Sequence, residues 1–262
     1  MRDPSALTDE FSPDFHSRRL RLPADADLLF GAQALRYSVY CEERAFLPRE
    51  LYPQRRESDR FDARSTHFCA FNRTGELVGY ARLVAAAQTG RFPFLAQGMP
   101  LLDGVALPAA RSAVEISRLM VRADYRRRRG DTLAGASAPD ADAAQDRERR
   151  RVASPQILLS LYRSMYSHSC DSGLRYWFAA MERPLARTLA QMNFVFRPVS
   201  PETDYFGPVT AYMADLRELE ELLDARQPAL MAWMRAPPVE APRGAPPAGA
   251  PVGLSTSLAS GG

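Results

Sequence analysis

The sequence contains no lysine, and all 34 of its basic residues are arginine. Catalysis through a lysine Schiff base or a lysine general base is therefore excluded. Alanine and proline are abundant, with 21 prolines in 262 residues, and this composition is typical of proteins encoded by GC-rich bacterial genomes. An arginine-rich run is consequently weaker evidence for a function in this chain than in a chain of average composition.

Cysteine is scarce, and no long apolar run is present. Cys41, Cys69 and Cys170 are an odd number at unrelated spacings, which argues against a disulfide framework and favours a reducing compartment. The N-terminal segment is acidic and lacks an apolar core, and no run approaches the roughly 18 apolar residues of a membrane span. We therefore expect a cytoplasmic protein with neither a signal peptide nor a transmembrane helix.

Charge and metal-ligating residues argue against two further classes of site. A net charge of +3 is too small to indicate nucleic-acid binding. His168 and Cys170 lie two residues apart, but two ligands do not make a metal site, and we expect no metal.

Length and composition indicate one folded domain with tails. The chain can bury a core of ordinary size, typical of a domain of about 200 residues. We predict a flexible leader at residues 1–17, a domain at 18–225 and a Pro/Ala/Gly-rich tail at 226–262 that cannot bury enough surface to fold. Within the domain, residues 131–154 have few apolar side chains and are predicted to form a poorly ordered insertion.

Hydrophobic periodicity predicts a mixed α/β fold. The expected elements are a helix that starts at Asp25 or Asp27, a hairpin of strands 66–72 and 76–85 around Arg73-Thr74-Gly75, a strand at 113–121, a helix from Pro155 to Gly173, a strand at 174–181, a helix at 182–194 and two further strands up to residue 215. A long charged loop between the first helix and the hairpin carries Asp59 and Asp62.

Two charged residues, Glu115 and Arg118, interrupt the apolar strand at 113–121. Removing a carboxylate from water costs several kcal/mol unless it is paired. Glu115 is therefore either a catalytic acid or base, or half of an ion pair with Arg118 or Arg82. Both interpretations stay open. Strand alternation places the two charges on opposite faces, and they meet at one site only if a β-bulge intervenes.

Four sequence blocks carry a resemblance to a known family. In chain order they are LRYSVYCEERAFL, ESDRFD, LVGYARLV and VEISRLMV. They resemble the signature blocks of autoinducer (acyl-homoserine-lactone) synthases, a branch of the GNAT superfamily of N-acyltransferases, and the likeness extends over roughly residues 18–215. The segment VYCEERAFLP and the arginine run after EISRLMV are more similar to the related PEP-CTERM/exosortase system-associated acyltransferases.

The resemblance implies both a fold and an activity. The fold would be an α/β (α+β) GNAT-like three-layer domain, with a central mixed, mostly antiparallel sheet flanked by helices. Strands 113–121 and 174–181 would diverge to admit a thioester. The activity would be transfer of a fatty acyl group from acyl carrier protein or CoA to a small amine, with no bound cofactor. A role in the PEP-CTERM/exosortase system is implied in the same way.

The resemblance also implies site residues. Glu115 and Arg118 would be catalytic, with Glu115 accepting the proton of the amine, because burial raises the pKa of a carboxylate. The implied substrate-binding residues are Arg36, Tyr40, Phe46, Asp59, Asp62 and Arg82. The charged members would form a network that either orders the site or contacts the acceptor. Tyr40 and Phe46 stand where the synthases carry Phe and Trp, and they would line the acceptor pocket or belong to the core.

Donor binding is expected after the strand at 113–121. The expected residues are Val121, Arg126, Arg127, Arg128 and Arg129. In GNAT proteins a glycine-rich turn lets the backbone approach the CoA pyrophosphate, and a single glycine beside these arginines compromises that approach. An acidic acyl carrier protein would suit this positively charged surface better. A solvated arginine face is the alternative. Phe92 and Phe94 are candidates for the floor of an acyl tunnel.

Two other functions remain open. The protein could be a true acyl-homoserine-lactone synthase with S-adenosylmethionine as acceptor. It could also be a catalytically silent GNAT relative that binds an acyl carrier protein as a scaffold.

Overall fold

The computed structural model describes residues 11–126, 141–205 and 207–236, and for residues 141–152 the backbone alone. In this part of the chain the strands are β1 (Phe15–Arg19), β2 (Ser65–Asn72), β3 (Leu77–Ala85), β4 (Ala113–Val121), β5 (Tyr176–Met181), β6 (Arg197–Pro198), β7 (Thr203–Asp204) and β8 (Pro208–Asp215). The sheet order is β1-β2-β3-β4-β5-β8-β6, and β7 pairs with β8. Only the β4–β5 pairing is parallel among the described strands. The predicted mixed, mostly antiparallel sheet is confirmed.

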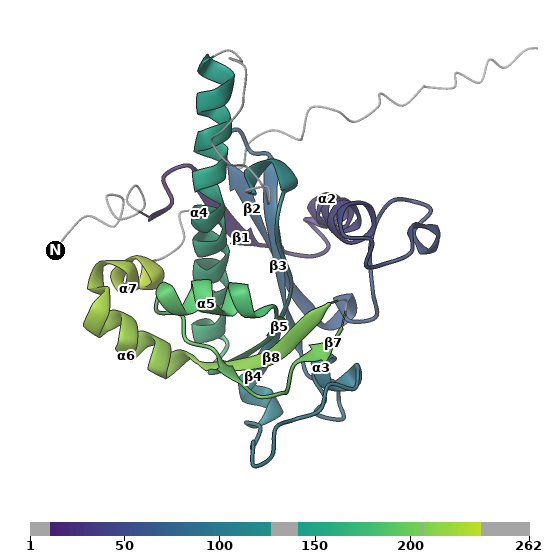
Figure 1. Cartoon of the computed structure of the whole chain (residues 1–262), viewed down its shortest axis with the longest axis vertical. Helices are drawn as coiled ribbons and strands as arrows, with labels where there is room; N and C mark the ends of the chain where they lie inside the picture. Colours follow the sequence, from purple (N-terminus) through teal and green to yellow (C-terminus); the bar gives the residue numbers. More distant parts are fainter. Residues whose placement is uncertain (1–10, 127–140, 206, 237–262) are drawn as a thin grey trace, which may run out of the picture.

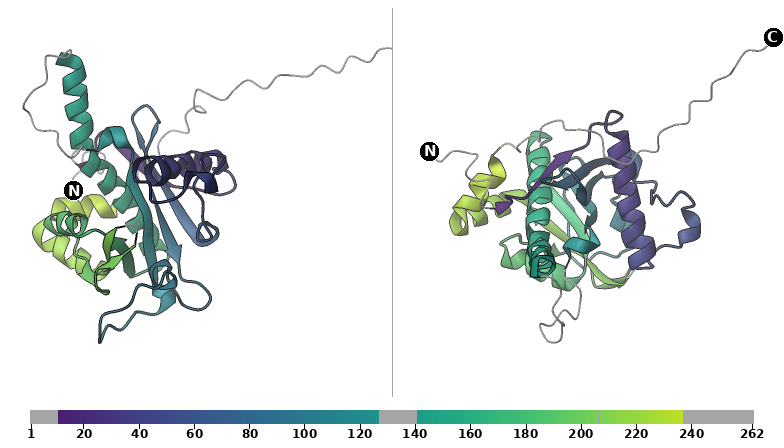
Figure 2. Two further views of the ribbon diagram at one scale, coloured as in Figure 1. Left: turned by 45° about the vertical axis from the view of Figure 1, so that its right-hand side comes forward. Right: turned by 90° about the horizontal axis from the view of Figure 1, so that it is seen from above.

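Helices cover both faces of the sheet. The α-helices are α2 (Ala26–Tyr37), α3 (Pro93–Ala96), α4 (Ala141–Asp171), α5 (Arg183–Gln191), α6 (Leu216–Arg226) and α7 (Pro228–Arg235), and short turns are η1 (Ser38–Glu43), η2 (Arg49–Leu51), η3 (Asp62–Arg64), η4 (Ala110–Ser112) and η5 (Ala123–Tyr125). Helix α4 packs on one face and α2 on the other, which gives three layers (Figure 1; Figure 2). The predicted arrangement of a central sheet flanked by helices in three layers is confirmed.

Helix α4 provides the larger part of the core. Ile157, Leu161 and Met165 are four residues apart, so they form one stripe, and all three are fully buried against the sheet. On the other face, Ala32 of α2 packs over Tyr80 of β3 in a smaller cluster. No helix in the described ranges is both long and apolar enough to cross a membrane.

Helix α2 begins where the sequence predicts, with Asp25 at its N-cap, whereas the predicted start of α4 differs from the structure. Asp25 occupies the N-cap position of α2 but does not cap it, because its carboxylate accepts hydrogen bonds from Arg18 and from the backbone N–H of Arg21. The prediction that α4 starts at Pro155 is wrong, since the helix begins at Ala141 and Pro155 lies inside it. Proline resembles a start signal because it lacks the N–H that an interior position donates. Residues 141–154 of the predicted insertion are therefore helical, and its residues 131–140 lie outside the described residues.

Two segments assigned to tails are part of the fold. Phe15 and Ser17 lie in β1, at the edge of the sheet, and Ser17 hydrogen-bonds Ser164 of α4. Helix α7 buries four apolar side chains, Leu230, Met231, Trp233 and Met234. The predicted leader and tail boundaries at residues 17 and 226 are wrong on this evidence. Residues 1–10 and 237–262 of these tails lie outside the described residues.

Candidate active site

A β-bulge brings the charged residues of β4 together. Tyr80 pairs with Met120 and Arg82 with Ser117, so β4 uses one residue more than β3 over this interval. Arg118 has a φ of 55°, which an L-residue rarely adopts. The extra residue moves Leu119 to the α4 face and leaves Arg118 on the same face as Ser117. The bulge required for Glu115 and Arg118 to share a site is present.

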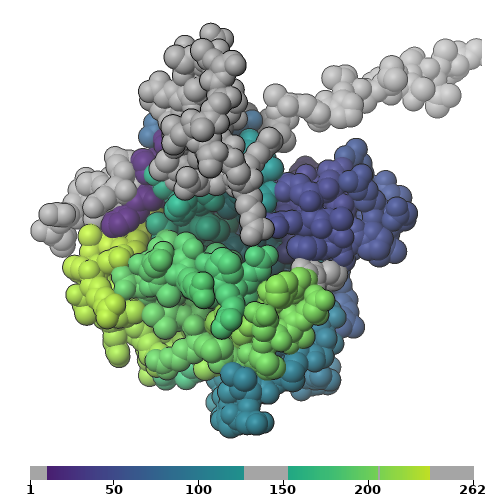
Figure 3. Space-filling view, in the orientation of Figure 1, coloured from purple at the N-terminus to yellow at the C-terminus, as the bar shows by residue number. Residues whose placement is uncertain are grey.

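A cleft opens where β4 and β5 separate. The two strands pair in parallel from Ala113 to Ile116 of β4, and no ladder pair follows although β4 continues to Val121 and β5 to Met181. The predicted divergence of these strands is confirmed. The cleft has a volume of about 430 Å³. Figure 3 shows the surface hollowed between the purple-blue segment of α2 and η1 and the green segment of α5.

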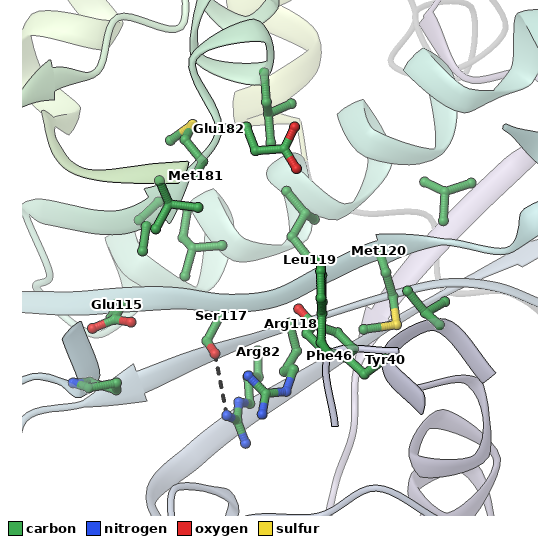
Figure 4. Close-up of a pocket in the computed structure, with 18 of the residues that line it drawn as sticks. Tyr40, Phe46, Arg82, Glu115, Ser117, Arg118, Leu119, Met120, Met181 and Glu182 are labelled. Carbon is green, nitrogen blue, oxygen red and sulfur yellow. Dashed lines mark hydrogen bonds between the residues drawn. The ribbon is translucent and has the colours of Figure 1, made fainter. Parts of the chain in front are cut away.

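The cleft has a polar half and an apolar half. On the α2 face it is lined by Tyr40, Phe46, Arg82, Glu115, Ser117, Arg118 and Tyr205. On the α4 face it is lined by Ile116, Leu119, Leu158, Tyr162, Met181 and Leu185. Figure 4 shows Ser117, Arg82 and Arg118 on one side of the β4 ribbon and Met181 and Glu182 on the other. A ligand in the gap between the strands would therefore meet charged residues of the ring on one side and, apart from Glu182, mostly hydrocarbon on the other.

Three arginines and three carboxylates form a closed ring beneath α2. In order around the ring they are Arg36, Glu57, Arg118, Asp59, Arg82 and Asp62. Each arginine contacts two carboxylates, and the six closest N–O distances range from 2.5 to 3.1 Å. The ring is therefore neutral and almost fully paired. It brings together the charged residues that the sequence analysis assigned to a network and adds Glu57.

The ring holds its carboxylates in the ionised form. Burial would raise the pKa of Asp59, but the hydrogen bonds and charge of Arg82 and the charge of Arg118 outweigh burial and lower it to about 2. The pKa values of Glu57 and Asp62 are lowered for the same reason, mainly by Arg36 acting against burial. A permanently ionised carboxylate is a poor general base.

Glu115 is a carboxylate outside the ring. Its side chain lines the cleft while the residue is only 5% exposed, and it accepts a hydrogen bond from the backbone N–H of Phe94 at 2.9 Å. Within the described residues no arginine forms an ion pair with Glu115, so the ion-pair interpretation is wrong. Burial raises the pKa of Glu115 to about 8, although the Phe94 N–H and the charges of Arg82 and Arg118 oppose this shift.

Tyr40 and Phe46 lie next to Arg118 in the polar half. The Arg118 guanidinium carbon is 4.6 Å from the centre of the Tyr40 ring, and the rings of Tyr40 and Phe46 meet edge to face at 5.9 Å. The backbone N–H of Phe46 donates to the Tyr40 carbonyl at 2.8 Å and fixes the turn that follows η1. Both aromatic residues line the cleft.

Phe92 and Phe94 are buried at the closed end of the cleft. Their ring centres lie 4.9 and 5.3 Å from that of Phe178, and Phe94 lines the cleft. Tyr205, in the turn between β7 and β8, was missed by the sequence analysis. Burial and the negative charge of Glu115 raise the pKa of Tyr205 against the opposing effect of Arg118, so its phenol is neutral in the cleft.

The open end of the cleft is formed by Val121 and Arg126. Arg126 forms an ion pair with Glu43 of η1, and both residues retain about a quarter of their side-chain exposure. Arg127, Arg128 and Arg129 lie outside the described residues. His168 hydrogen-bonds Arg19, and the described residues contain no cluster of three His, Cys, Asp or Glu side chains that could hold a metal ion.

Comparison with known proteins assigns a domain to this site. Residues 35–136, which include β2, β3, β4 and the whole charged ring, match the family model described as an acetyltransferase (GNAT) domain. Over this part of its length the chain is similar to GNAT acetyltransferase domains. No curated protein sequence matches the chain.

The fold is also similar to that of solved structures. TofI, solved in a ternary complex with an inhibitor and MTA, has a TM-score of 0.55 and 18% identity, over 83% of this chain and 96% of TofI. The CoA-dependent acyl-homoserine lactone synthase BjaI, solved with SAM and isopentyl-CoA, has a TM-score of 0.55 and 20% identity, over 84% and 98% of the two chains. The AHL synthase LasI has a TM-score of 0.54 and 17% identity, over 82% and 94%. At these identities the likeness establishes a shared fold.

Proposed function

We propose that the protein is an N-acyltransferase that moves a fatty acyl group from a thioester donor, acyl carrier protein or CoA, to a small amine. The observation that carries the proposal is the position of Glu115, a buried carboxylate outside the charged ring that borders the gap between β4 and β5. A pKa of about 8 suits a base that must remove a proton from an ammonium group near neutral pH.

The shape of the cleft supports a thioester on an extended arm. From Glu115 to Val121 the cleft follows β4 over roughly 20 Å, at about 3.3 Å per residue. A phosphopantetheine arm laid along β4 would place its thioester near Glu115 and its phosphate near Arg126. The apolar side chains of the α4 half, among them Leu119, Leu158 and Met181, would cover the hydrocarbon of the acyl chain.

The reaction follows from this placement. Glu115 takes a proton from the ammonium group of the acceptor, and the free amine attacks the thioester carbonyl carbon. The C–N bond forms and the carbonyl becomes an oxyanion. The C–S bond then breaks, a second proton passes from the attacking nitrogen to the leaving sulfur, and the products are the amide and a thiol, while the proton held by Glu115 is released to solvent. The bulge at Arg118 leaves one residue of β4 outside the ladder, and its N–H would hold the oxyanion. One such donor contributes about 3 kcal/mol to acyl transfer.

Arg118 would orient the acceptor. Glu57 and Asp59 of the ring fix its guanidinium, and Tyr40 stacks on it. The polar half of the cleft presents Tyr40, Phe46 and Tyr205 beside the Arg118 guanidinium. The acceptor would therefore be a small amine that also carries polar or anionic groups.

The proposal is tested with purified protein, fatty acyl-CoA or acylated carrier protein, and a panel of amines. Free thiol and amide are measured together, and both should appear in equal amounts only when protein and amine are present. Hydrolysis without amide would contradict the proposal. Absence of turnover from both the wild type and Glu115→Gln would instead favour a silent scaffold that binds carrier protein.

A lactone synthase is the second candidate. The acyl-homoserine lactone synthase BjaI shares the fold and was solved with SAM and isopentyl-CoA. Formation of an acyl-homoserine lactone when S-adenosylmethionine is the acceptor would favour this function. Absence of lactone together with amide formation on another amine would favour the first proposal.

Association with a PEP-CTERM/exosortase system rests on the resemblance of the VYCEERAFLP block and the arginine run. Neighbouring genes for an exosortase and its sorted proteins would support it. A neighbourhood with a regulator of lactone signalling would support the second candidate instead.

A further inference from the structure

One stripe of α4 lines the apolar half of the cleft. Ser154, Leu158 and Tyr162 are spaced four residues apart, so they lie on one side of the helix, and all three border the cleft. Ser154 and Leu158 are a small and an apolar side chain. Tyr162 adds a hydroxyl to a half-cavity that is otherwise mostly hydrocarbon.

The Tyr162 hydroxyl has no partner in the part of the chain that the structure describes. The residue is 1% exposed, and its ring packs on Trp177 and Phe194 with centres 6.0 and 5.2 Å apart. Nearby polar groups are paired: the Tyr166 hydroxyl donates to Glu220 at 2.7 Å and the Trp177 indole N–H donates to Ser169 at 2.9 Å. Tyr162 lines the cleft, so its hydroxyl can pair there with a ligand.

Tyr162 lies near the point where β4 and β5 diverge. Its ring contacts Trp177, which pairs with Val114 at the closed part of the strands, whereas the last pair before the gap joins Ile116 and Ala179. Tyr162 therefore faces the vertex of the cleft from the α4 side, and Glu115 faces it from the α2 side. A thioester donor at the vertex would have one of these groups on each side.

We propose that the Tyr162 hydroxyl is a recognition group for the acyl donor and donates a hydrogen bond to a donor oxygen in the apolar half of the cleft. This inference rests on the proposed function. The oxygen belongs either to the thioester and its pantetheine arm or to a 3-hydroxy or 3-oxo group on the acyl chain. Burial raises the pKa of Tyr162, so the hydroxyl keeps its proton and acts as a donor at every physiological pH.

Tyr162→Phe tests the proposal because it removes the hydroxyl and keeps the ring. Binding of octanoyl-CoA and 3-hydroxyoctanoyl-CoA is measured by titration calorimetry, with the same acyl groups on carrier protein as a second pair of probes. Loss of one neutral hydrogen bond should raise Kd about three- to tenfold. The melting temperature of the free protein should stay the same or rise, because the hydroxyl has no protein partner to lose. Tyr166→Phe is the matched control on the same helix and should leave Kd unchanged.

The outcomes separate the sources of the oxygen and the two proposals. An equal loss for both acyl groups places the hydrogen bond on the thioester or arm, and a loss for the 3-hydroxy donor alone places it on the chain. An unchanged Kd for every donor in Tyr162→Phe overturns the inference while leaving the proposed function intact. Wild-type protein that binds these donors tightly but forms no amide contradicts the proposed function and leaves the Tyr162 contact standing. No binding of any donor by the wild type contradicts both.

Discussion

Glu57→Gln is the sharpest test of the charged ring. Glu57 and Arg36 are both 0% exposed and lie 2.5 Å apart, and Glu57 also contacts Arg118. Removing one partner from a buried ion pair costs about 3–5 kcal/mol, because a charge is left without compensation. Arg36 keeps Asp62 and Arg118 keeps Asp59, so we expect a value near the lower end, about 3 kcal/mol. For a chain of this size that corresponds to a fall in melting temperature of roughly 6–12 °C.

The assay is urea unfolding and thermal melting of the full chain, with a matched exposed pair as control. Asp224 and Arg235 form an ion pair of 2.8 Å, and their side chains are 49% and 47% exposed. Asp224→Asn should therefore cost less than about 1 kcal/mol. In Arg36→Gln/Glu57→Gln the ring is neutral again, and the double variant should be more stable than the sum of the single effects by at least about 1 kcal/mol. Equal losses in Glu57→Gln and Asp224→Asn, or strict additivity in the double variant, would refute the account of the ring.

Two further predictions concern Glu115 and Arg126. A carboxylate whose pKa is raised by burial keeps its proton in the folded state while the unfolded chain has lost it, so the wild type loses stability as pH rises from about 4.5 to about 8. Glu115→Gln should match the wild type at pH 4 and exceed it at pH 8 in urea unfolding; equal stability at both values would contradict the buried position. Arg126→Ala should raise KM for the thioester donor about tenfold or more through loss of one charge-assisted contact and leave KM for the amine unchanged, whereas Arg122→Ala, which removes a guanidinium paired with Asp124 outside the cleft lining, should change neither. A change in KM for the amine instead would show that Arg126 does not bind the donor.

Strong local patterns predicted the elements that frame the site. Strand β4 is apolar from Ala113 to Val121 apart from Glu115, Ser117 and Arg118. The β2–β3 hairpin has Gly75 at its turn, where φ is +81°. The ring residues Arg36, Asp59, Asp62 and Arg82 were assigned from the resemblance rather than from the pattern. Their spacing in sequence has no period, because the ring joins a helix, a loop and two strands.

The missed residues lack a local signal. Glu57 lies in a loop rich in charge, and nothing near it in sequence distinguishes a fully buried carboxylate from an exposed one. Strand β1 is short and presents only Phe15 and Ser17 inward, so its alternation is too brief to read. Tyr205 reaches the cleft from a turn. Tyr162 reaches it from helix α4, whose apolar stripe already accounts for the helical pattern in the sequence. Only tertiary packing determines that these side chains border the gap between β4 and β5.

The C-terminal helix was missed for a different reason. Helix α7 follows α6 after a single residue and stands next to a long Pro/Ala/Gly-rich segment, whose composition dominated the interpretation. Its own signal was present in Pro228 at the first turn and in the apolar residues Leu230, Met231 and Trp233. A shorter window would have separated the helix from the segment that follows.

The central claim, that Glu115 accepts the proton of the amine, is tested most directly by the pH dependence of kcat/KM for the wild type and Glu115→Gln with one amine acceptor. Ionisation of the amine is the same in both experiments, so any difference belongs to the protein. We expect the wild-type profile to contain a group that must lose its proton with a pKa of about 8, and Glu115→Gln to be about 10²- to 10⁴-fold slower and to lack that group. A variant that keeps the wild-type rate and the same pH profile would show that the proton goes elsewhere.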